Sequence, residues 1–302
     1  MRILVTGSDG TLGRPLVNRL RRDGHEVWGL DLAHQGDPFS VRGDVREHRQ
    51  LDRLFRKLPF DLVYHLAAEF GRANGEDYYE VLWATNAVGT KNVLTCQQEH
   101  GFKLVFLSSS EVYGDLPVEL DEGVMGRQEV RQLNDYAISK WVNELQIMNA
   151  ATQHATETVR VRMFNAYGPG EYFTPYRSVI ARFAYSIVRG EPYTVHLGHD
   201  RSFLYVDDAV DALTAIAGNF VPGAVYNIGS TDLRSIRELS DLMLAIEGKD
   251  DSMVTYSERE PFTTVTKRIV VSRAERDLNL RPRVSLEEGL RRTLSWMRDA
   301  YR

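Results

Sequence analysis

The chain of 302 residues contains a single cysteine, Cys96. One cysteine cannot form an intrachain disulfide, so the sequence favours a reducing compartment. Cys96 lies in a stretch with helical periodicity, where we expect a buried or half-buried thiol rather than a nucleophile. No apolar run approaches the about 18 residues that span a bilayer. Residues 1–5 lead at once into a glycine-rich stretch, too early for a signal-peptide core. We therefore expect a cytoplasmic protein with no membrane partner.

The sequence also lacks an excess of positive charge. Lysine and arginine number 37 and aspartate and glutamate 42, which gives a formal charge of −5. Proteins that bind nucleic acid usually carry a basic surface, so we expect no such partner. A local basic pocket for a phosphorylated small molecule stays compatible with this charge. The eight histidines are scattered, and neither an HExxH pattern nor a Cys/His cluster is present, so we predict no metal site and a structural role for His65.

The first half of the chain alternates short apolar runs with segments of helical periodicity. The runs cover residues 3–6, 27–30, 62–66, 104–107 and 159–164, and the helical segments cover 12–22, 51–58, 81–99 and 136–151. Continuous apolar runs suit strands that are covered on both faces. This alternation predicts an α/β fold with a doubly wound parallel sheet, whose strands end along one ligand-binding edge.

The second half has a less regular rhythm. Helical segments at 178–189, 207–217, 236–247 and 286–297 are separated by short strand-like runs such as 193–196 and 225–228. We predict a smaller α/β substrate-binding lobe over residues 166–302, from which the chain can return to the first sheet. Residues 1–165 would then form the domain that binds the cofactor and carries the catalytic pair.

A glycine-rich loop follows the first predicted strand directly and opens the first helix. It contains Gly7, Gly10 and Gly13, with Thr11 and Leu12 before the last glycine. Missing side chains permit a tight turn and close approach to a pyrophosphate, while the helix N-terminus supplies free N–H groups. These five residues are predicted to bind a dinucleotide; a purely structural turn is the alternative.

Asp31 ends the second predicted strand, 18 positions after Gly13. An acidic residue about 20 positions after such a loop accepts hydrogen bonds from the ribose hydroxyls of a dinucleotide. The same carboxylate repels a 2′-phosphate, and no arginine follows it. The sequence therefore favours NAD over NADP, with a solvated strand end as the alternative.

Tyr136 and Lys140 lie four residues apart in a predicted helix, which puts both side chains on one face. A tyrosine has a pKa near 10 and is a poor base at neutral pH. A neighbouring ammonium and a positively charged nicotinamide would favour the phenolate. We predict that Tyr136 is a catalytic base and that Lys140 assists it.

A polar run follows the strand at 104–107. Its residues Ser108, Ser109, Ser110 and Glu111 lie at the ligand-binding edge, where a hydroxyl can hydrogen-bond a reacting alcohol or carbonyl. A simple turn is the alternative for this run. Tyr113, two residues later, is expected to be a packing residue.

Taken together, these motifs resemble those of the extended short-chain dehydrogenase/reductases, specifically NAD-dependent nucleotide-sugar epimerases, dehydratases and decarboxylases. The resemblance covers nearly the whole chain. It rests on the glycine loop, Asp31, Gly43-Asp44-Val45, His65-Leu66-Ala67-Ala68, Asn86, the serine-rich run, Tyr136 with Lys140, Phe164-Asn165-Ala166-Tyr167-Gly168-Pro169 and residues 201–208. It implies a Rossmann-like fold, a homodimer and a nucleotide-diphosphate sugar as substrate.

The resemblance also implies roles for individual residues. Cofactor contacts fall on Asp44 and Val45 at the adenine, on Leu66, Ala67 and Ala68 near the nicotinamide, and on Ser108, Lys140 and Phe164, with Asn86 supporting the site. Substrate contacts fall on Ser109, Ser110, Glu111, Asn165, Arg177 and Arg201, the two arginines reaching the diphosphate. In this family a sugar carbon, usually C4, is oxidised transiently to a ketone.

The triplet Ser109-Ser110-Glu111 bears on the type of reaction. A carboxylate after the serine serves elimination or proton transfer at carbon, so we favour dehydratase or decarboxylase-like lyase chemistry over 4-epimerisation. The segment Lys267-Arg268-Ile269 departs from the arginine-containing motif of the decarboxylases, which indicates an unusual specificity. A simple alcohol dehydrogenase or ketoreductase, and a non-catalytic nucleotide-binding protein, remain alternatives from other classes.

Overall fold

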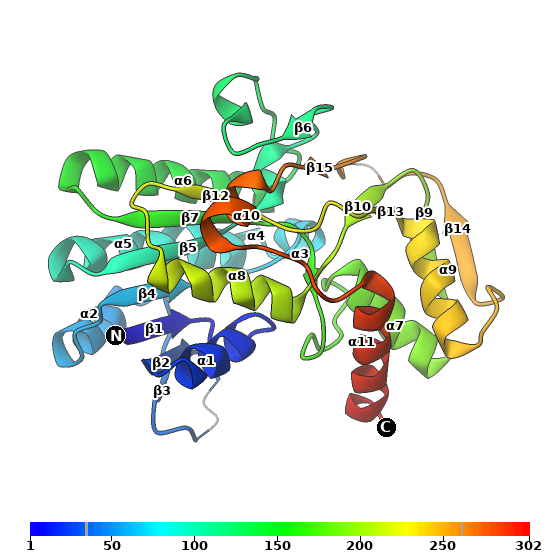
Figure 1. Ribbon diagram of the computed structural model, residues 1–302, viewed down its shortest axis with the longest axis horizontal. Helices are drawn as coiled ribbons and strands as arrows, with labels where there is room; N and C mark the ends of the chain where they lie inside the picture. Colours follow the sequence, from blue (N-terminus) through cyan, green and yellow to red (C-terminus); the bar gives the residue numbers. More distant parts are fainter. Residues whose placement is uncertain (34–35, 261) are drawn as a thin grey trace.

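A seven-stranded parallel sheet forms the centre of the computed structural model, which describes residues 1–33, 36–260 and 262–302 (Figure 1). The strand order is β12-β7-β5-β4-β1-β2-β3. The strands are β1 (Arg2–Thr6), β2 (Glu26–Asp31), β3 (Ser40–Arg42), β4 (Leu62–His65), β5 (Lys103–Ser109), β7 (Thr158–Met163) and β12 (Val225–Ile228). This order confirms the predicted doubly wound, Rossmann-like α/β fold.

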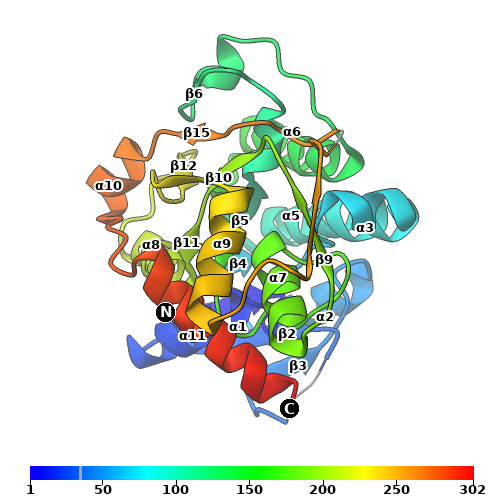
Figure 2. The same ribbon diagram turned by 90° about the vertical axis from the view of Figure 1, so that its right-hand side faces the viewer.

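Helices cover both faces of this sheet because its central strands are apolar on both sides. Ile3 and Val5 of β1 pack into one core with α1 (Gly13–Arg22) and α8 (Val206–Gly218). Leu4 points to the opposite face and packs with α2 (His48–Lys57) and α5 (Gly89–His100), beside α6 (Asp135–His154). Figure 2 shows α1 and α8 on one side of the strands and α5 and α6 on the other. Cys96 is buried in this second core, as predicted.

The chain after residue 165 contributes to two regions. β12 pairs in parallel with β7, so the chain returns to the main sheet. A separate group of elements lies beside that sheet (Figure 1). It contains α7 (Val179–Arg189), α9 (Ile236–Glu247) and α11 (Leu286–Ala300), the parallel pair β9 (Tyr193–His196) and β14 (Val254–Ser257), and the antiparallel pair β10 (Asp200–Ser202) and β13 (Leu233–Ser235). Two further parallel pairs join β8 (Ala166–Tyr167) to β11 (Leu204–Tyr205) and β6 (Glu119–Leu120) to β15 (Arg268–Ile269).

The helix predicted over residues 81–99 is divided in the structure. It consists of α4 (Tyr79–Trp83), a π-helical turn η1 (Ala84–Val88) and α5. A π turn widens the helix by one residue and is frequent at functional sites. The short helices α3 (Arg72–Asp77) and α10 (Ser272–Leu278) and the edge strand β3 were not predicted, since their periodicity is too short to recognise. No helix in the described ranges is long and apolar enough to cross a membrane.

Candidate active site

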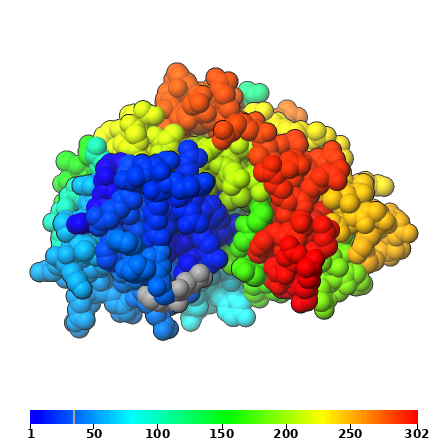
Figure 3. Space-filling view, turned by 60° about the horizontal axis from the view of Figure 1, so that its bottom comes forward, coloured from blue at the N-terminus to red at the C-terminus, as the bar shows by residue number. Residues whose placement is uncertain are grey.

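A cavity of about 450 Å³ lies at the carboxyl ends of the central strands. Its lining comes from the loop after β1, from the end of β5, from α6 and from the elements that follow residue 165. Figure 3 shows the N-terminal residues in blue and α11 in red on either side of an intervening green segment. The cavity is therefore built by both halves of the chain, as the predicted ligand-binding edge requires.

The glycine loop forms one end of this cavity in a backbone conformation that excludes side chains. Gly7 has a φ of +71°, and a Cβ atom there would lie 2.7 Å from the Ala67 nitrogen. A Cβ atom at Gly13, the first residue of α1, would lie 2.0 Å from the Gly7 carbonyl oxygen. The loop thus brings bare backbone and the start of a ten-residue helix to the cavity, which fits a dinucleotide pyrophosphate.

Asp31 lies beside this loop at the end of β2. Its carboxylate accepts hydrogen bonds from the backbone N–H groups of Asp9, at 3.0 Å, and Ala33, at 3.3 Å. These bonds fix the carboxylate beside the glycine loop, from where it is predicted to accept hydrogen bonds from the ribose hydroxyls. Asp44 is engaged differently, because its side chain binds Arg46 at 2.6 Å and that hydrogen bond lowers the pKa of Asp44.

The predicted cofactor residues separate into two groups. Those that line the cavity are Gly7, Gly10, Thr11, Leu12, Gly13, Leu66, Ala68, Ser108, Tyr136 and Lys140. Asp31, Asp44, Val45, Ala67, Asn86 and Phe164 lie outside this lining. Val45 and Phe164 are buried in the cores, whereas Asp31 and Ala67 adjoin the glycine loop.

Tyr136 and Lys140 both lie near the start of α6, as the four-residue spacing predicts. The Lys140 Nζ donates to the Leu107 carbonyl oxygen at 2.9 Å, and it lies 6.0 Å from the centre of the Tyr136 ring. Burial lowers the pKa of Lys140 to about 7. Burial raises the pKa of Tyr136 above its usual range, against a hydrogen bond with Ser109 that lowers it. The protein's own groups therefore do not stabilise the phenolate without a further positive charge.

Two polar residues outside the cavity lining support this site. Asn86, in the π turn, accepts from the Glu69 N–H at 2.8 Å and donates to Ser139 Oγ at 3.0 Å. It therefore links the segment after β4 to α6. His65 hydrogen-bonds Thr6 Oγ1 at 2.7 Å, and burial lowers its pKa to about 3, so its ring is neutral at physiological pH.

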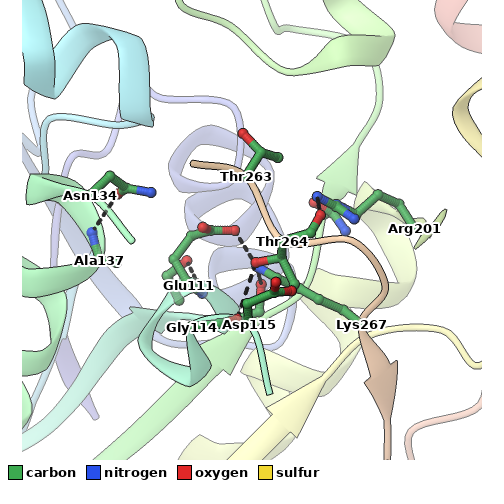
Figure 4. A network of polar contacts seen from close by, with 12 residues as sticks. Glu111, Gly114, Asp115, Asn134, Ala137, Arg201, Thr263, Thr264 and Lys267 are labelled. Carbon is green, nitrogen blue, oxygen red and sulfur yellow. Dashed lines mark hydrogen bonds and ion pairs between the residues drawn. The ribbon is translucent and has the colours of Figure 1, made fainter. Parts of the chain in front are cut away.

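Glu111 lies in the cavity wall and contacts a residue that the sequence did not identify as part of the site. Its carboxylate forms an ion pair with Lys267, which also donates to Ser110 Oγ at 3.3 Å (Figure 4). Burial acts to raise the pKa of Glu111, but the charges of Lys267 and Arg201 outweigh it and the net shift is downward. The sequence marked Lys267 only as a departure from a family motif, because 156 residues separate the pair.

The predicted substrate residues also meet at the cavity. Asn165 donates to the Ser202 carbonyl oxygen at 3.0 Å, and Arg177 is exposed at the rim. Arg201 is buried in the wall, and its guanidinium donates to the backbone carbonyls of Asp200, Thr264 and Val265. Its contact with a diphosphate stays a prediction. The cavity is also lined by Arg72, Glu171, Arg182 and Glu260, which no sequence motif marked.

Comparison with known proteins gives consistent matches. The model of the NAD dependent epimerase/dehydratase family matches residues 3–229. The chain is 30% identical to a UDP-N-acetyl-alpha-D-glucosaminuronate decarboxylase of Bacillus cytotoxicus, over 99% of this chain and 98% of that one. It is 28% identical to a UDP-glucose 4-epimerase of Mycolicibacterium smegmatis, over 99% of each chain. The crystal structure of Thermus thermophilus UDP-glucose 4-epimerase with NAD superposes with a TM-score of 0.89 at 26% identity, over 99% of this chain and 100% of that one.

Proposed function

The chain belongs to the NAD-dependent epimerase/dehydratase family, and from that premise we propose that it converts a nucleotide-diphosphate sugar through transient oxidation of the sugar to a ketone. One observation carries the proposal: Tyr136, Lys140, Ser109 and Glu111 line the same cavity as the glycine loop. A cofactor and a sugar can therefore meet within reach of a tyrosine base.

The cofactor site has the features that NAD requires. The backbone of Gly7, Gly10 and Gly13 would hold the pyrophosphate, and the Asp31 carboxylate would accept from the ribose hydroxyls. NAD held by these residues would supply a hydride acceptor for the sugar carbon. The nicotinamide ring would also bring a positive charge close to Tyr136, which the protein alone does not provide and which would stabilise the phenolate.

Each catalytic side chain has a distinct task in the proposed reaction. Tyr136 takes the proton of the sugar hydroxyl as the carbon is oxidised, and Ser109 hydrogen-bonds the same oxygen. The Lys140 Nζ lies 6.0 Å from the centre of the tyrosine ring, and its charge adds to that of the nicotinamide in favouring the phenolate once the cofactor is bound. Glu111 is the remaining carboxylate next to this group and serves proton transfer at the carbon beside the ketone.

We favour lyase chemistry on a UDP-hexuronate as the specific reaction. A relative that matches along almost its whole length is a UDP-sugar decarboxylase, and Glu111 provides a group that simple 4-epimerisation does not need. The second candidate is a UDP-sugar 4-epimerase, which the Mycolicibacterium relative and the Thermus structure favour. In either case Arg177 and Arg201 are proposed to face the diphosphate.

Further proposals concern the state of the protein in the cell. We place it in the cytoplasm because its only cysteine, Cys96, forms no disulfide. We propose a homodimer in which α4–α5 and α6 of two copies pack together, since apolar side chains are exposed on these helices. We also retain the division into a cofactor domain, residues 1–165, and a substrate lobe, residues 166–302.

The decisive experiment is a panel of nucleotide sugars incubated with the protein and NAD, followed by mass spectrometry. Loss of about 44 mass units, the mass of carbon dioxide, identifies decarboxylation, and loss of about 18, the mass of water, identifies dehydration. An unchanged mass with altered chromatography identifies epimerisation. Net formation of NADH with simple alcohols, and none with nucleotide sugars, would instead identify an ordinary dehydrogenase.

Replacing Tyr136 with phenylalanine tests the base directly. The phenol oxygen is lost while the ring that packs against Phe70 remains, so NAD affinity is expected to be unchanged. Turnover is expected to fall by about 10²–10⁴-fold, the range for loss of a general base. Rates are measured by product chromatography and NAD affinity by fluorescence titration. An unchanged rate would remove Tyr136 from the mechanism.

A further inference from the structure

Lys267 is one of the most deeply buried charged residues in the part of the chain that the structure describes. Its side chain is 1% exposed, and its ammonium forms an ion pair with the Glu111 carboxylate and donates to Ser110 Oγ at 3.3 Å. Glu111 is 30% exposed and lines the cavity. Figure 4 shows Lys267 reaching Glu111 from the side opposite Asn134. The lysine thus lies behind the carboxylate that faces the substrate.

The segment that carries Lys267 is fixed on this side of the cavity by hydrogen bonds to residues 114–115 and to Arg201. Thr264 Oγ1 donates to the Gly114 carbonyl oxygen at 3.1 Å, and the Val265 N–H donates to Asp115 Oδ1 at 3.0 Å. Arg201 donates to the carbonyls of Thr264 and Val265. These bonds fix the backbone just before Lys267, so the stem of the lysine side chain starts from a defined position on this side of the cavity.

Burial of a lysine is costly unless a negative charge is next to it. The charged and titratable groups around the pair are Arg201 and Tyr136 near Glu111, and Arg201 and Asp115 near Lys267. Two cations, Lys267 and Arg201, therefore act on Glu111, and Tyr136 is neutral in the resting protein. This arrangement favours the ionised carboxylate over the carboxylic acid.

We propose that Lys267 is a positioning residue that holds Glu111 as a carboxylate against the sugar, so that Glu111 is a proton acceptor in the resting enzyme. The proposal deepens the proposed function and rests on it. It assigns a role to Lys267, which lies in a segment whose sequence departs from the decarboxylase motif.

The step that Glu111 performs is transfer of a proton at the carbon next to the ketone. The C–H bond breaks, its electron pair becomes the enolate of the ketone, and the proton binds a Glu111 oxygen to give a neutral carboxyl group. By microscopic reversibility the protonated Glu111 formed in this way returns a proton to the enolate. Lys267 keeps its own proton throughout and does not touch the substrate.

The test measures exchange of this sugar hydrogen in heavy water. A nucleotide sugar turned over by the protein is incubated with NAD in D₂O, and deuterium uptake is followed by mass spectrometry over a range of pH. Lys267→Met removes the ammonium but keeps the length of the side chain. We expect its exchange rate at neutral pH to be at least about tenfold lower than that of the wild type. In the plot of exchange rate against pH, the acid limb should move to higher pH by at least about one unit.

Three matched variants accompany this measurement. Lys267→Arg retains the charge and is expected to bring the acid limb back toward that of the wild type. Arg268→Met changes the exposed neighbour on β15 and is expected to leave the profile unchanged. Glu111→Gln is expected to abolish exchange but still to form NADH absorbance in a single turnover. An acid limb in Lys267→Met at the same pH as in the wild type would overturn the proposal.

A second measurement needs no substrate and keeps the two proposals separate. Thermal stability is compared for the wild type, Lys267→Met, Glu111→Gln and the double variant. Without Lys267 the Glu111 carboxylate is buried with one cation fewer, so its folded-state pKa rises and the loss of stability is greater at pH 8 than at pH 5. Glu111→Gln should relieve that loss. If Lys267→Met loses the same stability at pH 5 and pH 8, and Glu111→Gln does not restore it, the pairing of the two residues is contradicted. If the protein turns over no nucleotide sugar, only the proposed function is contradicted.

Discussion

The surroundings of the Asp31 carboxylate lead us to expect that it influences the choice between NAD and NADP. It is fixed by the N–H groups of Asp9 and Ala33, and the residues that follow it, Leu32 and Ala33, carry no positive charge. A carboxylate held in this way can accept from a ribose 2′-hydroxyl but repels a 2′-phosphate. We therefore expect this one side chain, beside the glycine loop, to decide between NAD and NADP.

Replacement of Asp31 by alanine is therefore expected to weaken NAD binding by about 1–3 kcal/mol, the value of a hydrogen bond to a charged group. The affinity for NADP should rise or stay constant, so the preference for NAD over NADP decreases. Fluorescence titration with both cofactors measures the change. The assignment is wrong if the unaltered protein already binds NADP more tightly than NAD.

At the residue scale the sequence located the groups that follow strand ends but not their partners. Ser109, Glu111 and Asp31 are predicted from their places at or just after the end of a strand, and all lie at or beside the cavity. Lys267 had no such local signal, since its partner is 156 positions away and only the folded chain brings them together. The hydrogen bonds of Arg201 to backbone carbonyls were equally inaccessible, because they depend on the path of residues 264–265.

At the scale of elements, a buried ionic network joins β5, β7 and α6 behind the site. Glu144 of α6 is 0% exposed, and it accepts from Ser108 Oγ of β5 at 2.6 Å and from Arg162 of β7 at 2.8 and 2.9 Å. Arg160 adds a third cationic contact at 3.3 Å. The network fixes the end of β5, and with it the polar run 108–111, against the helix that carries Tyr136.

Neutralising this network should lower stability strongly. In Glu144→Gln the buried guanidinium of Arg162 loses its counter-charge, and loss of one partner of a buried pair costs about 3–5 kcal/mol. The matched control is Glu129→Gln, which affects an exposed pair with Arg131 and should change stability by about 0–1 kcal/mol. Urea unfolding followed by circular dichroism measures both. Equal midpoints for the two variants would show that the network does not stabilise the fold.

The elements themselves were predicted to different degrees. Helix α9 has the predicted bounds because its hydrophobic spacing determines them, and the four-residue strand β9 also has the predicted bounds. The π turn at 84–88 was not foreseen, since it depends on the Asn86 side chain reaching the backbone of Glu69. Apart from β9, the strands of the small two-stranded pairs were not predicted, because each has two to four residues and its partner is distant in sequence.

For the whole molecule, one group of exposed apolar side chains lies on two neighbouring helical segments. Val81 and Val88, in α4 and the π turn, and Ile138, Leu145 and Met148, in α6, are each between 36% and 52% exposed. The two segments contact one another, so these side chains belong to neighbouring elements. Monomeric proteins seldom expose large contiguous apolar surfaces, and such a surface favours self-association.

A charge placed on this surface is expected to separate the proposed homodimer. Leu145 is 45% exposed, so arginine at that position can reach solvent in a monomer but would be desolvated, facing a second copy, in a dimer. Leu145→Arg should therefore halve the mass measured by light scattering after size-exclusion chromatography, with an unchanged circular dichroism spectrum. The control is Val221→Arg, whose side chain is 51% exposed and lies after α8, outside these helices. The surface is not a dimer interface if the wild-type protein already has the mass of one chain, or if Leu145→Arg retains that of two.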